Sequence, residues 1–457
     1  MLVSLVLCAG LLISPWRGHV DDTDAQLYQV VARNMARDGR WLDPSYLPSV
    51  YPHFREHLPF GFWPMALAIR LFGEGALPVL GLLWSLATLA LVGWLGWRLL
   101  DPWSAVCAVL VLGLTETFFI YGARPRLDPP LLFFSTAAAA LVLNRPGQIR
   151  SWLLAAALGA VSCLIKGPFG LLPLAAAAAA CAIVERSTKP LLLGVFATLL
   201  AAFPTALFVW IDHIAGSGSW WEGYGRSQLL ASALGSRTDG STSPFYPLLS
   251  IAGRFWPGLP FVALGFFRAA RPAASDSKER IVATRLIALF NILLVLELVL
   301  LPGRKWWNHA LIAYPALALL AGAGAGAFLR QLSRARAVVA PALVALAAIA
   351  WGMSLAGFGA KFLPKPCVVS TEFAGPLSEA AAHEPILLVS SPTNWRMIAA
   401  LAAERDLFPE PAESFAPAKR NGSQGRFALL QEKLLVPSSP SWQEVARARG
   451  WVLLRRP

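Results

Sequence analysis

The sequence predicts an all-α protein that crosses a membrane many times and ends in a small α/β domain. Its 457 residues are 56% hydrophobic and only 14% charged, whereas soluble domains average about a quarter charged. The mean hydropathy of +0.56 agrees with a membrane protein. Long apolar runs recur up to residue 360 and then stop. We therefore expect a transmembrane domain over residues 1–360 and a separate domain over residues 361–457.

Apolar runs of spanning length define the transmembrane part. Measured against a hydrocarbon core that needs about 20 helical residues, they predict about eleven spans. The runs are residues 1–16, 76–99, 104–121, 130–144, 151–165, 168–184, 190–211, 256–268, 281–301, 309–329 and 337–359. The first run has no basic segment before it and no A-x-A site after it. We interpret it as a span and not as a removed signal peptide.

Basic residues in the short loops predict the orientation of these spans. One side carries Arg98, Arg145, Arg150, Arg186, Lys189, Arg268, Arg271, Lys278, Arg280, Arg285, Arg330, Arg334 and Arg336. Short loops rich in Lys and Arg face the cytoplasm. An odd number of spans then places the first loop, about residues 17–75, and the C-terminal domain outside the cytoplasm.

The outer side also carries cations, close to the ends of the spans. Lys or Arg at a span end ordinarily reaches the lipid headgroups, but the positive-inside rule predicts few of them on this side. They are Arg124, Arg126, Lys166, Arg226, Arg254, Arg304 and Lys305, and all six histidines fall on the same side. Ionisable groups at membrane depth are candidates for function. A ring of cations around an outward cavity suits an anionic substrate such as a lipid phosphate.

The first outer loop begins with a predicted amphipathic helix at the membrane interface. Thr23 and Gln26 have the spacing of a capping box, and Asp24 falls in the first turn, where the helix dipole favours negative charge. Asp24 and Tyr28 are four residues apart and share a helix face. We interpret Asp21 and Asp22 as loop or capping residues. The apolar stripe is Leu27, Val30, Val31 and Met35, with Arg33 and Arg37 directed elsewhere.

Later outer loops repeat a pattern of acids and bases where spans begin or end. In YGARPRLDPP, residues 121–130, Asp128 lies beside Arg124 and Arg126. In CLIKGPFG, residues 163–170, Lys166 precedes a Gly-Pro break between two spans. LPGRKWWNHALIAYP, residues 301–315, repeats the pattern with Lys305. Each motif is weak alone, but their convergence on one side of the spans predicts a site.

The last hundred residues have the pattern of a small α/β domain. Residues 385–391, 426–433 and 450–456 are predicted strands. Asn394 is the predicted cap of a helix that continues to Asp406. No catalytic motif is recognised in this region.

The first outer loop carries a family resemblance. The stretches DAQLYQVVARNMARDGRWLDP and REHLPFGFWPMALAIRLFG resemble the first loop of the GT-C membrane glycosyltransferases. The most similar branch is that of the aminoarabinose (lipid A) transferases and protein O-mannosyltransferases. ARPRLDPP, LIKGPFGLLP, FWPGLP and RKWWNHALIAYPALALLAG match later family blocks in order, so the resemblance spans most of residues 15–330. Ala25, Leu27 and His57 depart from the pattern, which has an acid, an arginine and a lysine there.

The resemblance implies a GT-C-like fold and an inverting glycosyltransferase in the bacterial inner membrane. Such an enzyme moves a hexosyl or pentosyl group from a polyprenyl-monophosphate carrier to an acceptor hydroxyl, of a lipid A-like glycolipid or a protein, on the outer face. By similarity Asp24 would be the base and Asp128 a second carboxylate that orients the acceptor or tunes Asp24. The implied phosphate ligands are Tyr28, His57, Lys166, Arg226 and Lys305, and the supporting residues are Glu56, Arg124, Arg126 and His309. Membrane lipids are the remaining implied partner.

Other classes of protein and site fit the sequence less well. A lipid or polyprenyl-phosphate transporter is the main alternative, but transporters place ionisable groups near the membrane midplane on repeated, broken helices. The net charge of +13 is spread over loops, so no nucleic-acid partner is predicted. No cofactor is predicted. A divalent metal at Glu56 and the nearby histidines is not predicted, because paired or surface histidines are commoner. The five cysteines lack metal spacing and are interpreted as small buried hydrophobes.

Overall fold

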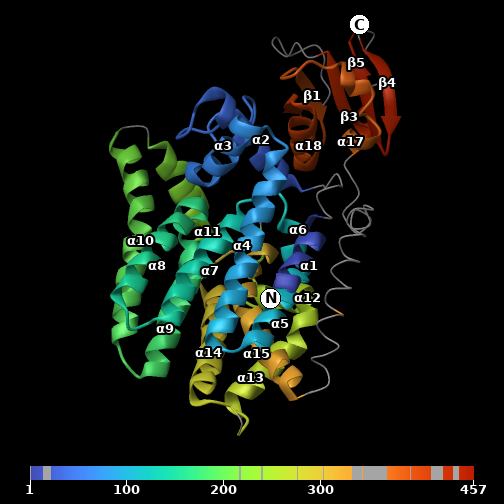
Figure 1. Cartoon of the computed structure of the whole chain (residues 1–457). Helices are drawn as coiled ribbons and strands as arrows, with labels where there is room; N and C mark the ends of the chain where they lie inside the picture. The colour runs from blue at the N-terminus through green and yellow to red at the C-terminus, as the bar shows by residue number, and fades with distance from the viewer. Residues whose placement is uncertain are drawn as a thin grey trace. The chain divides into compact units, whose positions relative to one another are not determined.

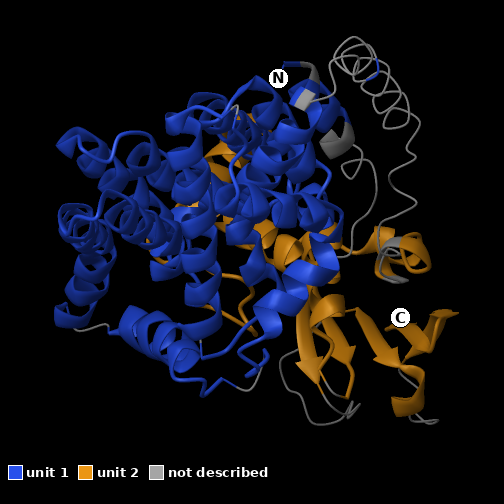
Figure 2. Cartoon of the chain, turned by 90° about the horizontal axis from the view of Figure 1, so that it is seen from below, with its two compact units in different colours: residues 1–16, 55–61, 78–359 blue, residues 17–54, 62–77, 360–457 orange. Residues whose placement is uncertain are grey.

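The computed structural model describes residues 2–13, 22–215, 218–237, 240–274, 276–301, 303–331, 342, 368–391, 393–412, 426–435 and 442–456. The chain forms two compact units, coloured separately in Figure 2. The first unit consists of residues 1–16, 55–61 and 78–359. The second consists of residues 17–54, 62–77 and 360–457, so most of the first loop is grouped with the C-terminal residues. The expected boundary at residue 360, between a transmembrane domain and a C-terminal domain, remains a prediction.

The first unit is a bundle of helices (Figure 1). Its α-helices are α1 (Leu2–Ile13), α4 (Ala76–Leu99), α5 (Pro102–Gly113), α6 (Glu116–Tyr121), α7 (Asp128–Asn144), α8 (Ile149–Lys166), α9 (Leu172–Glu185), α10 (Lys189–Ile214), α11 (Ala231–Ala233), α12 (Tyr246–Arg254), α13 (Leu259–Ala270), α14 (Lys278–Leu300) and α15 (Tyr314–Gln331). The short 3₁₀ segments are η2 (Pro59–Phe62), η3 (Pro168–Leu171), η5 (Trp256–Gly258) and η6 (Trp307–Ala313). The last residue of η2 belongs to the second unit. Segment η4 (Trp221–Leu230) is a π-helix.

The apolar runs expected from the sequence are helical over most of their length wherever the structure describes them. Six helical segments are long and apolar enough to span a membrane. They are Ala76–Leu99, Ile149–Lys166, Pro168–Glu185, Lys189–Ile214, Lys278–Leu300 and Trp307–Arg330. A pair bent by 78°, Tyr246–Arg254 with Trp256–Ala270, is a seventh candidate. The protein is therefore a multi-pass membrane protein.

The described residues do not reach the expected count of about eleven spans, because several runs are broken or short. The run 104–121 is interrupted after Gly113, so it forms α5 and α6. The run 130–144 forms α7, a shorter apolar helix. The last expected span, 337–359, lies outside the described residues.

Helix α15 lies in the middle of the bundle, with 94% of its spanning window buried. Its AGAGAGA stretch allows neighbouring backbones to approach closely, since a Cβ at Gly322 would collide with the Ser104 carbonyl of α5. A Cβ at Gly324 would collide with the Phe261 carbonyl of α13. Small residues serve this purpose in membrane helix packing. Four of the five cysteines are buried and free, as expected, and Cys367 lies outside the described residues.

The second unit combines two helices of the first loop with a small α/β domain (Figures 1 and 2). The helices are α2 (Thr23–Asp38), α3 (Trp63–Phe72), α17 (Val368–Thr371) and α18 (Trp395–Arg405), with 3₁₀ segments η8 (Pro376–Glu379) and η9 (Glu432–Leu434). The strands are β1 (Pro385–Val389), β2 (Phe408–Ala412), β3 (Phe427–Gln431), β4 (Gln443–Ala448) and β5 (Trp451–Arg455). The predicted fold class, a helical membrane protein with a small C-terminal sheet domain, is confirmed.

The sheet has the strand order β2-β1-β3-β5-β4. Strand β1 is parallel to β2 and β3, whereas β5 is antiparallel to β3 and β4. The predicted strands are the three central ones. The edge strands β2 and β4 were missed because β2 reads FPEPA, with two prolines, and β4 reads QEVARA, which is largely exposed. Proline within a sheet is largely confined to edge strands, and edge strands often carry charged residues, so both features weaken the sequence signal.

The start of α2 differs from the predicted capping box by one residue. The N-cap is Asp22, whose carboxylate accepts a hydrogen bond from the Ala25 backbone N–H at 3.2 Å. Thr23 is therefore the first helical residue, and the Gln26 side chain does not bond to the backbone N–H of the cap residue as a capping box requires. Its amide donates instead to Glu404 of α18 at 2.8 Å. Asp21 lies outside the described residues. The predicted cap of α18 is confirmed, because Asn394 accepts from the Met397 N–H at 3.0 Å.

Candidate functional site

Asp128 is the centre of the candidate site in the first unit. It opens α7, and the two prolines that follow it lack N–H groups that would need partners there. A carboxylate in the first helical turn is favoured by the helix dipole. The side chain is only 5% exposed. A buried carboxylate at a span end needs cationic partners.

Two predicted cations supply those partners. Arg126 donates through Nε to Oδ2 of Asp128 at 3.0 Å, and Lys166 donates through Nζ to Oδ1 at 2.9 Å. The Arg126 guanidinium also lies over the Tyr121 ring, 3.9 Å from its centroid. Each carboxylate oxygen thus has its own cation, which stabilises the ionised form of Asp128.

The break after α8 places Lys166 in this cluster. Gly167 has φ +78°, a conformation that glycine adopts without strain, and a Cβ there would collide with the Tyr224 hydroxyl. Helix α8 therefore ends at Lys166, and the chain turns into η3. Because Lys166 pairs with Asp128 of α7 and its side chain is 16% exposed, the geometry favours a site residue over one that only reaches lipid headgroups.

Lys305 and His309 come from the segment that leads into α15. Lys305 is 4% exposed, and its backbone pairs with Ser241 through two hydrogen bonds of 2.8 and 2.9 Å. The His309 ring packs against Phe169 and Trp306, with centroid distances of 4.7 and 5.1 Å. Its Nδ1 is buried and makes no hydrogen bond with the part of the chain that the structure describes.

His57 lies in the electrostatic field of the same cluster. Its desolvated surroundings lower the pKa of the imidazole to about 3, and the positive charge of Lys166 acts in the same direction. Asp128 opposes the effect, while Arg237 and Arg126 add to it. The ordinary pKa of 6.5 would allow a cationic His57 in mildly acidic solution, but these surroundings favour the neutral imidazole.

We expect the pH dependence of kcat/KM to show no titration of His57 between about pH 5.5 and 8.5. Since the pKa is depressed, protonation begins only as the pH falls toward about 3. His57→Gln should keep the shape of the profile and lower kcat/KM by roughly tenfold or less, the effect of one neutral hydrogen bond. The check is a pH series on both proteins. A wild-type decline near pH 6.5 that His57→Gln abolishes would show that a cationic His57 is needed.

Arg237 belongs to the cluster and was missed by the sequence analysis. Its guanidinium lies 4.9 Å from the centroid of the Trp306 ring and donates to Gln228. It also interacts electrostatically with both His57 and His309. The residue lies in a stretch, LGSRTDGSTS, that matches no motif. Only its position in a loop between two helical segments could have indicated it.

Other predicted residues are placed outside this group of contacts. Arg226 is on η4 with a side chain 70% exposed, and it pairs with Glu222 one turn away. Arg124 is buried in the turn before α7, where Gly81 of α4 packs on its backbone. Glu56 is partly buried next to His57 in the chain. Among the described residues, no group of three or more His, Cys, Asp or Glu side chains is arranged to hold a metal.

Asp24 and Tyr28 belong to the second unit. Asp24 is exposed in the first turn of α2. Tyr28 is buried, with its ring edge against Phe62 at a centroid distance of 5.6 Å. The two residues come from one helix but differ in exposure, which is compatible with a reactive carboxylate and a packed tyrosine.

The chain has the fold of the GT-C membrane glycosyltransferases, as the resemblance in its sequence predicted. Residues 56–210 match the family described as dolichyl-phosphate-mannose-protein mannosyltransferase. Searching the curated proteins gave no significant match.

Solved structures with this fold include one bacterial and one archaeal protein. ArnT from Cupriavidus metallidurans, bound to undecaprenyl phosphate, is similar with a TM-score of 0.71 and 17% identity, over 99% of this chain and 96% of that one. The oligosaccharyltransferase AglB from Archaeoglobus fulgidus, in complex with an inhibitory peptide and a dolichol-phosphate, has a TM-score of 0.56 and 13% identity, over 94% of this chain and 69% of that one.

Proposed function

We propose that this protein is an inverting glycosyltransferase that takes its sugar from a polyprenyl-monophosphate carrier. The observation that carries the proposal is the cluster around Asp128, in which Arg126 and Lys166 are held at the ends of α7 and α8. Lys305, His309 and the newly found Arg237 add donors or charge to it. The carrier lipids bound by ArnT and AglB support the same substrate class.

The chemistry requires an anion site and a base. The acceptor hydroxyl oxygen attacks the anomeric carbon, the bond from that carbon to the phosphate oxygen breaks, and the carrier leaves as a phosphate monoester. Cations that neutralise the leaving phosphate lower the barrier without a general acid. The proton of the acceptor hydroxyl passes to a carboxylate, a step that contributes roughly 100- to 10,000-fold.

The residues divide between these two tasks. We assign the base to Asp24 from the family motif and from its exposure in the first turn of α2. Lys166, Lys305, His57 and Tyr28 are assigned to the donor phosphate. The ion pairs of Asp128 support a role in orienting Arg126 and Lys166, beside the predicted role toward the acceptor. The exposed Arg226 remains a phosphate ligand only as a prediction, with Glu56 and Arg124 as supporting residues.

The sugar acceptor is proposed to be a lipid A-like glycolipid or a protein on the outer face of the inner membrane. A deletion strain and its complemented counterpart can be compared by mass spectrometry of extracytoplasmic glycolipids and glycoproteins. We expect one sugar-modified product to disappear with the gene and return with it. Loss of the product together with carrier-linked sugar confined to the cytoplasmic leaflet of the deletion strain would instead indicate the alternative transporter. The same glycans in both strains would contradict the proposal.

A further inference from the structure

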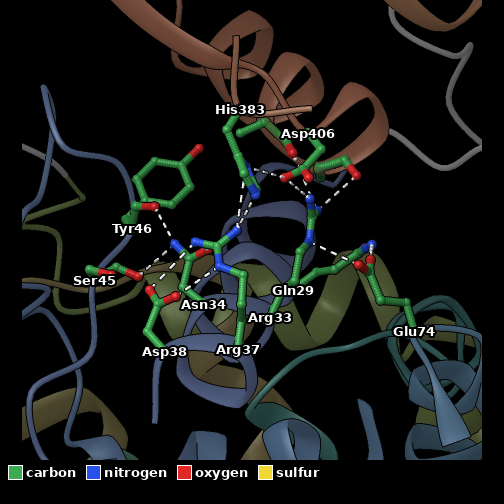
Figure 3. A network of polar contacts seen from close by, with 12 residues as sticks. Gln29, Arg33, Asn34, Arg37, Asp38, Ser45, Tyr46, Glu74, His383 and Asp406 are labelled. Atoms are coloured by element: carbon green, nitrogen blue, oxygen red, sulfur yellow. Dashed lines mark hydrogen bonds and ion pairs between the residues drawn. The ribbon is translucent and has the colours of Figure 1, made fainter. Parts of the chain in front are cut away.

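Arg33 of α2 contacts two other segments of the second unit, the residues after α3 and the end of α18 (Figure 3). Its Nε lies 2.9 Å from Oε1 of Glu74, just beyond α3, and its Nη1 donates to the carboxylate of Asp406. Its Nη2 donates to the carbonyls of Ala403 at 3.0 Å and Ala402 at 3.3 Å. The side chain is only 11% exposed. Arg33 had been expected to point away from the packed face, and the structure shows the opposite.

Three of these partners, Ala402, Ala403 and Asp406, form the C-terminal end of α18. Ala402 and Ala403 lie in the last turn of the helix, and Asp406 is its C-cap with φ +52°. The last carbonyls of a helix have no partners within it and carry partial negative charge. A guanidinium satisfies them because its planar fork presents several donors in fixed directions. Lysine, with one ammonium group, cannot reach both the carbonyls and the two carboxylates in this way.

Further contacts between the first loop and the C-terminal residues surround Arg33. Gln26 donates to Glu404 at 2.8 Å. The Arg37 guanidinium lies 2.6 Å from Nε2 of His383 (Figure 3). Ser49 donates to the Pro409 carbonyl at 2.9 Å, and the Tyr51 ring stacks on Trp395 at 6.2 Å. The α/β domain and α2 therefore form one packed body.

We propose that Arg33 is a positioning residue for sugar transfer, through which the C-terminal domain holds the helix that carries the base. The inference rests on the proposed function, since it assigns Asp24 to the reaction. Arg33 is about 14 Å along the helix from Asp24 at 1.5 Å per residue, so it acts through α2 and not by contact with substrate. A displacement of a reacting group by about 1 Å can lower a rate roughly 100-fold. The C-terminal domain thereby has a task although it contains no catalytic motif.

The experiment compares Arg33→Gln, Asp406→Asn and the double variant with wild type, in the full-length protein. Backbone hydrogen exchange measures how firmly α2 is packed against the C-terminal domain. Steady-state kinetics with a polyprenyl-monophosphate sugar measure the rate of sugar transfer. Arg33→Gln should increase exchange over residues 23–38 and 395–406 and lower kcat at least tenfold, with KM for the donor unchanged. Asp406→Asn, which tolerates the left-handed C-cap, should show a smaller change. The double variant should lose less than the sum of the two single variants, because both changes break the Arg33–Asp406 contact, although Asp406 also pairs with His383.

Arg447→Gln is the matched control. Arg447 pairs with Glu432 and Glu444 within the C-terminal domain, and its side chain is 42% exposed. Wild-type exchange and kcat are expected for this variant. If Arg33→Gln does not fold, Asp406→Asn provides the same two measurements.

The two readouts separate failure of this inference from failure of the proposed function. Unchanged exchange over residues 23–38 in Arg33→Gln would overturn the inference whatever the enzyme does. Raised exchange with full kcat would also overturn it, provided that Asp24→Asn is inactive. Full activity of Asp24→Asn would instead refute the proposed base, while the exchange data would still decide whether Arg33 holds α2.

Discussion

Asp24→Asn is expected to abolish measurable sugar transfer in a protein that remains folded. The loss of a general base lowers the rate by roughly 100- to 10,000-fold. The fold should tolerate the change because Asp24 is exposed and the cap of α2 is supplied by Asp22. Removing one charge from a first helical turn costs only about 0.3–1 kcal/mol. Mass spectrometry of glycolipids and glycoproteins from cells that carry each version measures the effect.

Asp22→Asn is the matched control, two residues away. Asparagine is as good an N-cap as aspartate, so this variant should keep both the helix and the transfer activity. Asp24→Glu should retain part of the activity, because the carboxylate is kept on a longer stem. Unchanged glycans with Asp24→Asn would exclude this carboxylate as the base.

Lys166→Met is expected to lower kcat/KM for the carrier-linked sugar by roughly 100- to 1,000-fold, the usual effect of removing one donor from an electrostatic site. Lys166, which we assign to the donor phosphate, lies 2.9 Å from Asp128. Its loss would remove one cation from the proposed phosphate site and leave the buried carboxylate with Arg126 alone. A drop in thermal stability should therefore accompany the drop in activity. Transfer assays in membranes and a melting curve measure the two effects.

Two further variants separate catalysis from stability. Lys166→Gln keeps a neutral hydrogen-bond donor beside Asp128, so it should recover part of the stability lost in Lys166→Met but little of the transfer activity. Lys189→Met changes an exposed lysine at the start of α10, where a lysine that only contacts headgroups is expected to matter little. Equal activity of Lys189→Met and Lys166→Met would show that Lys166 has no role in the site.

The fold could be predicted where the signal is local. Apolar runs of spanning length indicated the helices, and Asn394 indicated the start of α18. The central strands β1 and β3 are nearly all apolar, so they were recognised. The same reasoning missed the edge strand β2, because its two prolines argue against a strand. Its pairing with β1 forms only in the folded sheet.

The sequence indicated Asp128 and Lys166 as candidates for the site but not their pairing. Asp128 and Lys166 stood out because charged groups at span ends are rare and need a reason. Arg237 did not, because an arginine among Gly, Ser and Thr resembles any solvated loop. His57 shows most clearly what the sequence cannot predict. The residue type gives only the ordinary pKa of an imidazole, whereas burial in the fold and the nearby Lys166 lower this pKa to about 3.

The sequence by itself therefore determined a helical membrane protein and the small domain that follows. Tertiary structure alone decided that Lys166 is bound to Asp128, and that Arg33 closes the end of α18. The physical reason is the range of the interactions. Helical periodicity and capping act within a few residues, whereas these contacts join groups 38 and 370 positions apart, which only the packed chain brings within hydrogen-bonding distance.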